Sequence, residues 1–337
     1  MAGIHKSALL LLPLLVSLLT KKADQQQYSI HGYAQGTDYS VKYFATDSIV
    51  TKASIDSILI KIDSSMSLYK PYSQISQFNR SKTGMRIDDH FAAVMRKSFE
   101  VYRETNGKFD VTVAPLVQAW GFGPKPVTSF PDSARIKQLL QNVGMHHLSL
   151  KGNYLKKKKP AMTIDLNGIA QGYSVDVVAD YLLKKGIRSF IVEIGGELRV
   201  EGPKPDGSVM RIGIEGPAAS SIDEPEIRHV LSFSTGAITT SGNYRKYLQR
   251  GKGKIAHLIN PKTGYPLDNQ LISATIFAKD AITADGYDNA VMAMSVEEAL
   301  AFVARKKGME AYLIYHRKDG SVADTLTNGF RKMILIK

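Results

Sequence analysis

The sequence predicts a single mixed α/β or α+β domain, and three observations lead to this fold class. Segments with strand periodicity and segments with helix periodicity alternate irregularly along the chain, which is typical of mixed folds. No internal repeat is found, and no linker longer than a few residues divides the chain. The 337 residues are 44% hydrophobic and 22% charged, a composition that suits one large globular domain or two modest ones.

Residues 1–22 are predicted to be an export signal or a retained membrane anchor, which leaves residues 23–337 for the catalytic domain. The apolar block ALLLLPLLVSLL covers residues 8–19 and follows Lys6. Such a block is short for a membrane span, which needs about 20 residues, and it matches the apolar region of a signal peptide. The alternative is a buried N-terminal helix. The chain has no cysteine, which is compatible with export.

The formal net charge of +13 is partly local, because basic residues cluster at residues 21–22 and 156–159. Such runs are usually solvated faces, although they could also favour an anionic membrane surface or an anionic substrate. Aromatic residues do not interleave with basic residues as they do in proteins that bind single-stranded nucleic acid. We therefore expect no nucleic-acid partner.

Periodicity predicts the elements of the first half in order. They are two strands within residues 28–44, a helix over 51–66, a loop over 67–81, a helix over 89–105, a short strand after Asp110, a helix over 131–142, and a hairpin over 148–162. Pro71 forbids a continuous helix in the loop, and Pro115 ends the short strand. The lysine run of residues 156–159 is expected on the exposed return strand of the hairpin.

The second half is predicted in the same way. The elements are a strand over residues 162–166, a helix over 174–185, a strand pair within 189–200, strands over 211–215 and 230–233, a strand over 272–278, helices over 281–294 and 295–306, and strands over 311–316 and 332–336. Gly195 and Gly196 are adjacent within strand-like sequence, which indicates a bulge or a closely approaching ligand.

The segment over residues 272–294 is the strongest candidate for a functional site. Asp285 and Asp288 fall in the first turns of its helix, among the small residues Ala284, Gly286 and Ala290. Small neighbours would let a ligand approach the backbone, and a carboxylate there can hold a hard divalent cation together with a substrate phosphate. The alternative is an ordinary helix whose N-terminal acids are favoured by the helix dipole.

Two further segments carry weaker signals. Residues 162–174 combine a strand, a turn with Gly168 and Gly172, and a helix start, a geometry that presents backbone N–H groups to phosphate. The glycine spacing matches neither a Walker nor a Rossmann fingerprint. His257 lies in a loop with Asn260 and Gly264 rather than on an apolar face, so a structural and a functional role both stay open.

Seven motifs occur in order: MSLYKPYSQISQFN, GKFDVTVAPLVQAWGFGP, DLNGIAQGYSVD, VEIGGELRVEG, STGAITTSGNYRKY, HLINPKTGYP and AITADGYDNAVMAMS. Together they resemble the ApbE family of FAD:protein FMN transferases over residues 28–337. The resemblance implies a domain with T-fold-like layers of sheet and helix and an active site in a central cleft. It also implies an Mg²⁺-dependent enzyme that cleaves FAD, attaches FMN to a threonine hydroxyl through a phosphoester, and releases AMP.

The resemblance also assigns roles to individual residues. The Mg²⁺ ligands are the backbone oxygen of Ala170 and the side chains of Asp285 and Asn289, and His257 is the base that takes the threonine proton. The positions implied to contact FAD are Tyr69, Asn79, Asp110, Gly168, Gln171, Asp176, Glu193, Gly195, Gly196, Ser241, Gly242 and His257. Asn289 stands where the family more often has threonine, and Gln171 stands where it has lysine. The cysteine that often carries a lipid anchor in the family is absent.

The implied partner is a flavoprotein with the motif Asp-x-(Ser/Ala)-(Gly/Ser)-Ala-Thr, for example a subunit of a redox complex. The expected location is the periplasmic side of the bacterial inner membrane. Two alternatives remain: a Mg²⁺-dependent FAD pyrophosphatase that gives FMN and AMP, and a non-catalytic periplasmic flavin-binding protein.

Overall fold

The computed structural model describes residues 25–216, 226–243, 247–250 and 253–336. The leader predicted at residues 1–22 lies outside this part of the chain. Among the helices of the described residues, none combines the length and the apolar character that crossing a membrane requires.

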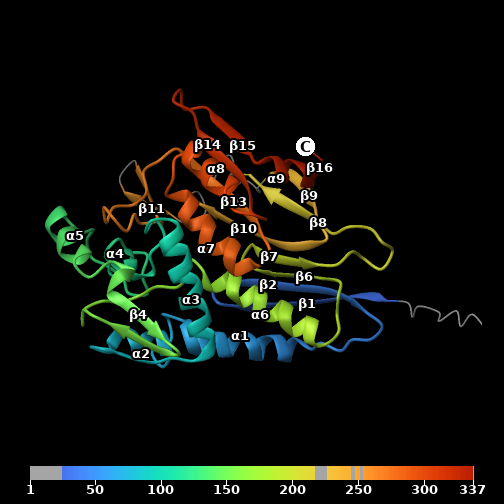
Figure 1. Cartoon of the computed structure of the whole chain (residues 1–337), viewed down its shortest axis with the longest axis horizontal. Coiled ribbons are helices and arrows are strands. Elements are labelled where there is room, and N and C mark those ends of the chain that lie inside the picture. The colour runs from blue at the N-terminus through green and yellow to red at the C-terminus, as the bar shows by residue number, and fades with distance from the viewer. Residues whose placement is uncertain (1–24, 217–225, 244–246, 251–252, 337) are drawn as a thin grey trace, which may run out of the picture.

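An eight-stranded sheet forms the centre of the molecule (Figure 1), and every pair of neighbouring strands in it is antiparallel. In spatial order the strands are β1 (Gln26–Ala34), β2 (Thr37–Ala45), β6 (Phe190–Ile194), β7 (Glu197–Glu201), β10 (Thr235–Gly242), β13 (Leu271–Ala278), β14 (Glu310–His316) and β15 (Val322–Leu326). The fold is therefore a mixed one, as the sequence predicts.

One face of the sheet is covered by helices (Figure 1), namely α1 (Lys52–Met66), α3 (Asp89–Glu104), α6 (Ala170–Lys184) and α7 (Ala281–Met292). Side chains from α3, α7 and β13 share one buried apolar cluster, which includes Phe91, Val291 and Ile276. Side chains from α1, α6, β2 and β6 share a second. Removing the apolar surface of these side chains from water stabilises the packing of the helices on the sheet by about 25 cal/mol per Å².

The opposite face is covered by a second sheet in the order β16 (Ile334–Ile336), β9 (Ile227–Ser232) and β8 (Arg211–Glu215), together with α9 (Asn328–Met333). Side chains of β10 contribute to the apolar clusters on both faces of the sheet, since successive side chains of a strand point to opposite faces. Ile238 packs with Ile212 and Leu231 in the cluster of the second sheet, whereas Ala237 belongs to the cluster on the helical face.

The remaining elements surround these layers. They are α2 (Gln74–Arg80), β3 (Gly84–Arg86), β4 (Leu148–Lys151), β5 (Tyr154–Lys157), α4 (Ala114–Ala119), α5 (Ser133–Leu140), α8 (Val296–Ala304), β11 (Tyr247–Arg250), β12 (Gly253–Ala256), and two 3₁₀ turns at Val111–Val113 and Met145–His147. Among them, α8 packs against β14 in the apolar cluster that contains side chains of α3 and α7. The third sheet has the order β3-β5-β4, so the predicted hairpin over residues 148–162 is present as β4 and β5.

Two predictions in the first half were wrong because local capping overrides strand or loop propensity. The predicted loop over residues 67–81 contains α2, which begins after Pro71 where the Ser73 hydroxyl accepts the Ser76 N–H at 3.2 Å. The predicted strand after Asp110 is instead a 3₁₀ turn that continues into α4. Pro115 stands in the first turn of that helix, where its missing N–H removes no hydrogen bond.

The lysine run on the hairpin was predicted to be exposed, and this is wrong for Lys157. Its side chain is buried, and its Nζ donates to the carbonyl oxygens of Met162 (2.8 Å), Phe78 (3.2 Å) and Asn79 (3.4 Å). Strand alternation explains the difference, because Lys156 and Lys158 point to solvent while Lys157 points inward.

Residues 162–166 were predicted to form a strand, but the structure has a segment without regular secondary structure there. The Asn79 side chain takes the place of a partner strand, because its Nδ2 donates to the Ile164 carbonyl at 2.9 Å and its Oδ1 accepts the Ile164 N–H at 2.8 Å. The helix predicted from residue 174 already begins at Ala170. Gly195 and Gly196, with φ of 66° and 104°, form the turn between β6 and β7 rather than a bulge.

Two elements near the C-terminus, β15 and α9, were not predicted, and the final strand is limited to Ile334–Ile336. The predicted helices over residues 51–66, 89–105, 281–294 and 295–306, and the strand over 272–278, are confirmed with ends that differ by a few residues.

Candidate functional site

The start of α7 is built by capping side chains. The chain leaves β13 at Ala278, and the Asp280 carboxylate accepts the N–H of Thr283 at 3.0 Å, which begins the helix. The small residues Ala281, Ala284 and Ala290 are fully buried and let α7 lie close to its neighbours. Asp285 and Asp288 are carried into the interior by this helix and are only 3% and 1% exposed.

α6 contacts α7 at its first turn. The backbone N–H of Gly172 donates to Oδ2 of Asp285 at 2.8 Å. A Cβ at position 172 would lie 2.3 Å from the carbonyl oxygen of Ala281 and 2.7 Å from Cβ of Asp285, so only glycine fits. The structure therefore brings the α6 start, which includes Ala170, next to Asp285.

The amide of Asn289 lies in the middle of an oxygen-rich cluster. Its Nδ2 lies 2.9 Å from Oδ1 of Asp288, 3.1 Å from the Asp285 carbonyl, 3.2 Å from the Gly168 carbonyl and 3.5 Å from Oδ1 of Asp285. Its Oδ1 accepts the Ser241 hydroxyl at 3.3 Å. Oxygen atoms from α7 and from the turn before α6 thus surround the Nδ2 of Asn289.

Burial shifts both carboxylates of this cluster toward the protonated form. Desolvation raises the pKa of Asp285 to about 7. Desolvation also raises the pKa of Asp288 well above its usual range, and the charge of Asp285 adds to that shift. Two buried acids this close need a positive partner if both are to be charged. A hard divalent cation with oxygen ligands is such a partner.

The chemistry of the donor set fits such a cation when backbone and amide oxygens are included. Within the described residues, no group of three or more His, Asp or Glu side chains is placed to hold a metal ion without them. The Ala170 carbonyl, which the resemblance implies as a ligand, accepts the Ser174 hydroxyl at 2.8 Å. Asp285 and Asp288 therefore supply the carboxylate oxygens that a cation would find here, whereas Asn289 directs its Nδ2 at them and its Oδ1 at Ser241.

A cavity of about 280 Å³ lies at the turns that join β1 to β2 and β6 to β7. Three of the residues that the resemblance implies as FAD contacts line it, namely Glu193, Gly195 and Gly196. Asp38 and Glu215 also line it. A Cβ on Gly195 would lie only 2.6 Å from Nε2 of Gln171, so the first turn of α6 reaches this glycine turn. Gln171 precedes Gly172, which bonds to Asp285, so the first turn of α6 reaches both the glycine turn and the carboxylate cluster, an arrangement that the sequence alone does not reveal.

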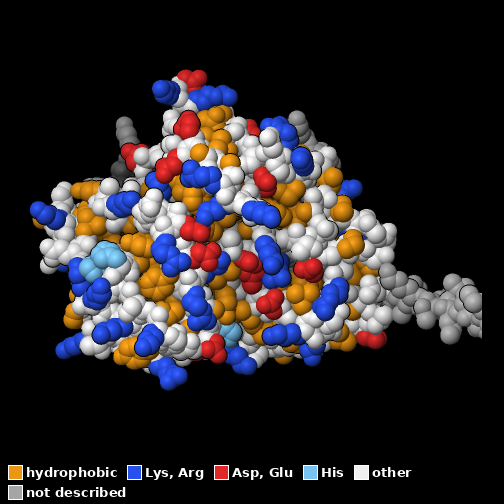
Figure 2. Space-filling model, viewed as in Figure 1, with side chains coloured by type: hydrophobic (Ala, Val, Ile, Leu, Met, Phe, Trp, Pro, Cys, Tyr) orange, Lys and Arg blue, Asp and Glu red, His pale blue; other side chains and the backbone are white. Residues whose placement is uncertain are grey.

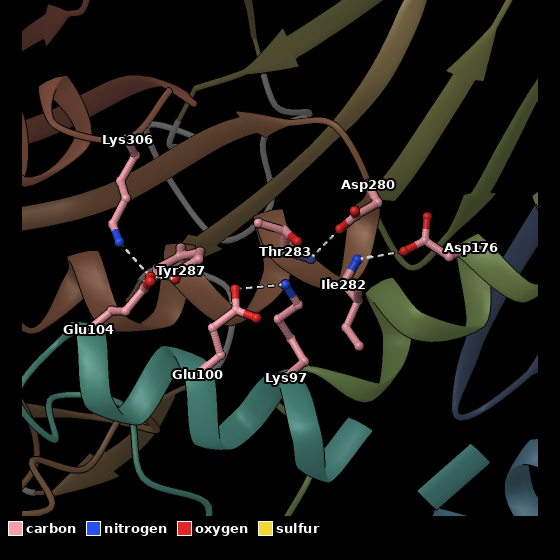
Figure 3. A network of polar contacts seen from close by, with 9 residues as sticks. All are labelled: Lys97, Glu100, Glu104, Asp176, Asp280, Ile282, Thr283, Tyr287 and Lys306. Atoms are coloured by element: carbon pink, nitrogen blue, oxygen red, sulfur yellow. Dashed lines mark hydrogen bonds and ion pairs between the residues drawn. The ribbon is translucent and has the colours of Figure 1, made fainter. Parts of the chain in front are cut away.

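A second cavity of about 440 Å³ lies between α3, α6 and the start of α7. Its lining contains both basic and acidic side chains, including Arg96, Lys97, Asp176, Arg199 and Asp280. Figure 3 shows this region, with the Asp176 carboxylate directed at the backbone of Ile282 and Lys97 paired with Glu100. In Figure 2, Lys and Arg side chains are spread over this face of the molecule, whereas Asp and Glu gather near its middle.

Three residues that the resemblance implies as FAD contacts bond to the protein's own backbone. Asp110 is buried, and its carboxylate accepts the N–H groups of Thr112 (2.8 Å) and Met145 (3.1 Å). Asn79 bonds to Ile164 as described above, and Asp176 bonds to the first turn of α7. Each side chain therefore holds two distant segments together, a role that differs from the implied contact with FAD.

The other implied residues lie in different surroundings. Tyr69 is 67% exposed in the turn between α1 and α2. The ring of His257 packs edge-on against Phe122, with 6.3 Å between the ring centroids. Ser241 and Gly242 lie on β10, and Ser241 joins the carboxylate cluster through Asn289.

Two residues of the cluster were missed from the sequence. Thr239 is fully buried on β10 and opposes the rise in the pKa of Asp288, whereas the charge of Glu197 adds to it. Alternation in the strand sequence could have indicated Thr239, since it shares a face with Ser241. Glu197 comes directly after the Gly195-Gly196 turn, a position from which a strand's first side chain can reach a site beside the turn.

The fold and site define a mixed α/β protein with an oxygen-rich carboxylate cluster buried between two helix starts. The family model described as the ApbE family matches residues 35–313. An FAD:protein FMN transferase of Vibrio cholerae is 35% identical over 302 residues, which cover 88% of this chain and 89% of that protein. One of Haemophilus influenzae is 33% identical, and the match covers 97% of both chains.

Solved structures agree with this relationship. The flavin transferase ApbE of Vibrio cholerae superposes with a TM-score of 0.82 at 33% identity, covering 92% of this chain and all of that one. The apo form of the flavinyl transferase ApbE of Pseudomonas stutzeri gives the same TM-score at 30% identity, covering 93% of this chain and 98% of that one. The chain belongs to the ApbE family.

Proposed function

We propose that this protein is an FAD:protein FMN transferase, which moves FMN from FAD to a threonine hydroxyl of an acceptor protein and releases AMP. The observation that carries the proposal is the buried cluster of Asp285, Asp288 and Asn289 beside the first turn of α6. The name of the relatives supports the reaction, because the two matches above extend over most of both chains.

The proposed cofactor is Mg²⁺, with Asp285, Asn289 and the Ala170 carbonyl as its protein ligands. When bound, the cation would neutralise phosphate charge and favour departure of AMP. The raised pKa of the Asp285 carboxyl supports a cation site, since no positively charged side chain of the described residues offsets the desolvation of its charged form. The start of α6 also favours the anionic pyrophosphate, because the N-terminal end of a helix carries partial positive charge.

The remaining groups would orient the reactants. The threonine Oγ would form a bond to the phosphorus of the FMN phosphate, the P–O bond to AMP would break, and His257 would take the hydroxyl proton. The glycine turn at Gly195 and Gly196 would let the ligand lie close to the backbone in the 280 Å³ cavity. Gln171, which lies beside that turn, would donate its amide N–H groups to the ligand in place of a charged lysine.

The proposed acceptor carries the motif Asp-x-(Ser/Ala)-(Gly/Ser)-Ala-Thr. The proposed location is the periplasmic side of the inner membrane, reached by means of the leader at residues 1–22 and with membrane association through it. Expression of the full chain, followed by fractionation and N-terminal sequencing, tests export and cleavage. Recovery of the uncleaved chain in the cytoplasm would contradict this part of the proposal.

The reaction is tested by incubating the protein with FAD, MgCl₂ and a purified acceptor domain that carries the motif. We expect a fluorescent acceptor band in a denaturing gel and an acceptor mass increased by one phosphoester-linked FMN. An acceptor with threonine replaced by valine, a reaction with EDTA, and the Asp285→Asn variant serve as controls without product. A well-characterised transferase with the same acceptor shows that the acceptor is competent.

Other outcomes would replace the proposal. FMN and AMP formed without acceptor, as fast as transfer occurs with it, would identify an FAD pyrophosphatase. FAD that binds and is recovered unchanged in the presence of a competent acceptor would identify a flavin-binding protein.

A further inference from the structure

Asp176 makes an unusual set of contacts at the start of α7. It lies on α6, is 8% exposed, and its Oδ1 and Oδ2 accept the backbone N–H groups of Ala281 (3.0 Å) and Ile282 (2.8 Å). The first N–H groups of a helix have no partner within the helix. Asp280 caps only the third of them in α7, at Thr283, and Asp176 caps the first two from another helix.

The same face of α6 reaches α7 at a second point. Gly172 lies one turn before Asp176 and donates to Asp285, which lies one turn after Ala281. α6 and α7 therefore run antiparallel across this contact and are joined at both of its ends. One end is the backbone-to-carboxylate bond at Asp285, and the other is the carboxylate-to-backbone pair at Asp176.

Arg199 fixes the outer end of this contact to the sheet. Its Nη1 lies 3.1 Å from Oδ1 of Asp176 and 3.3 Å from Oδ1 of Asp180, and its side chain is 15% exposed. Arg199 is on β7, the strand that begins with Glu197 beside the carboxylate cluster. A displacement of the Asp176 carboxylate would therefore disturb both its hydrogen bonds to the start of α7 and its ion pair with Arg199 on β7.

We propose that Asp176 is a positioning residue for FMN transfer, which sets the first turn of α7 so that Asp285 keeps its place against Gly172. This inference rests on the proposed function. It assigns Asp176 no contact with FAD. Groups that orient a metal ligand from outside its immediate shell typically change metal affinity by about 10–100-fold when they are replaced.

The test compares Asp176→Asn with Asp180→Asn. Both substitutions remove one negative charge next to Arg199 on the same helix, but only Asp176 bonds to α7. For each protein, kcat, KM for FAD and the melting temperature are measured, and Mn²⁺ affinity is measured by electron paramagnetic resonance without FAD.

For Asp176→Asn we expect kcat to fall about 10-fold or more, Mn²⁺ binding to weaken by about the same factor, and KM for FAD to stay within about two-fold. Asp180→Asn should resemble the wild type in all of these. Asp176→Glu retains a carboxylate that can accept both N–H groups, so it should recover part of the kcat and part of the Mn²⁺ affinity.

A folded Asp176→Asn variant with a lower melting temperature but unchanged kcat and Mn²⁺ affinity would overturn the inference and leave Asp176 a purely structural role. If Asp176→Asn does not fold, Asp176→Glu decides in its place, and wild-type values in that variant at reduced stability would overturn the inference. Absence of FMN transfer by the wild type would contradict the proposed function instead. The Mn²⁺ measurement would still test whether Asp176 positions Asp285.

Discussion

The Gly172 N–H donates to Oδ2 of Asp285 at 2.8 Å, and this bond joins the first turn of α6 to the carboxylate at the centre of the site. The glycine is required by the close approach of two helices, since a Cβ there would meet both the Ala281 carbonyl and Cβ of Asp285. Gly172 lies within the first turn of α6 rather than in the turn before it. Its N–H donates to the Asp285 side chain and is not available to a phosphate.

Gly172→Ala should separate α6 from α7 and weaken both the fold and the cation site. Inserting a methyl group into a packed contact costs about 1–3 kcal/mol, and the lost bond to a buried carboxylate adds to this. Urea unfolding without metal measures the stability, and Mn²⁺ titration measures the site. Gly213→Ala is the stability control, because a Cβ there meets nothing closer than 3.4 Å. Equal behaviour of the two variants would contradict the argument.

Asn289→Asp should make the stability of the protein depend more strongly on divalent cations. It places a third carboxylate where the Asn289 amide now donates to Asp288 at 2.9 Å, so repulsion among buried acids should lower the metal-free melting temperature. Mg²⁺ should bind the variant more tightly and recover more stability than in the wild type. Thermal unfolding with and without MgCl₂ measures both effects. A variant that loses stability and gains none from Mg²⁺ would argue against a cation at this point.

The helix and strand around the site could be predicted because their signals are local. Alternation over residues 272–278, followed by the helix cap Asp280 and small residues, predicts β13 and α7 to within a few residues. The ends of α6 could not be placed so well. Its first turn contains Gly172, a residue that disfavours a helix on its own and is retained here by the contact with α7.

The parts of the site that could not be predicted depend on contacts between distant segments. Asp176 bonds to Ile282, 106 residues later, and Asn79 bonds to Ile164, 85 residues later. A local pattern shows only that these side chains are polar and good at capping. The resemblance identifies Asp285 as a site residue, but the hydrogen bond from Gly172 and the place of Asn289 among four oxygens come from the structure.

The stability of the metal-free protein should depend on pH through Asp176. Desolvation raises the pKa of this carboxyl from 3.8 to about 6; Asp280 on α7 adds to the rise, and the backbone bonds to α7 and Arg199 on β7 oppose it. The folded state thus binds the proton more tightly than the unfolded state. The stabilising contribution is fully present below about pH 4 and is lost as pH rises through about 6, a change of up to about 3 kcal/mol.

The measurement is the difference in unfolding free energy between wild type and Asp176→Asn at pH values from 4 to 7. Groups that do not interact with Asp176 cancel in that difference, whereas Asp285, whose pKa the Asp176 charge raises, contributes to it. The wild type should gain on the variant as pH falls. Asp180→Asn removes an exposed carboxylate from the same helix and serves as the comparison variant. Arg96 and Lys97 of α3 line the same cavity. A flat difference for Asp176→Asn would show that its carboxyl titrates normally in the folded protein.

Lys157→Met should destabilise the protein although it removes a buried charge. Burial lowers the pKa of the Lys157 ammonium, so its charge has a desolvation cost. When it is replaced, the carbonyls of Met162 and Asn79 lose their donor, whereas the carbonyl of Phe78 still accepts the Ser81 N–H at 3.1 Å. Buried acceptors left without a partner cost about 1–3 kcal/mol each, which outweighs the gain from removing one partly compensated charge. Two of those carbonyls, of Asn79 and Met162, hold the segment that leads into α6.

Lys158→Met is the matched control, because the neighbouring side chain is exposed and its loss should change the unfolding free energy by less than about 0.5 kcal/mol. Urea unfolding of both variants gives the comparison. Hydrogen exchange at the Ile164 amide, whose bond to Asn79 depends on this segment, gives a local measure and should be faster only in Lys157→Met. If both variants are as stable as the wild type, water must satisfy the carbonyls of Asn79 and Met162, and the buried ammonium is not needed to hold the segment that leads into α6.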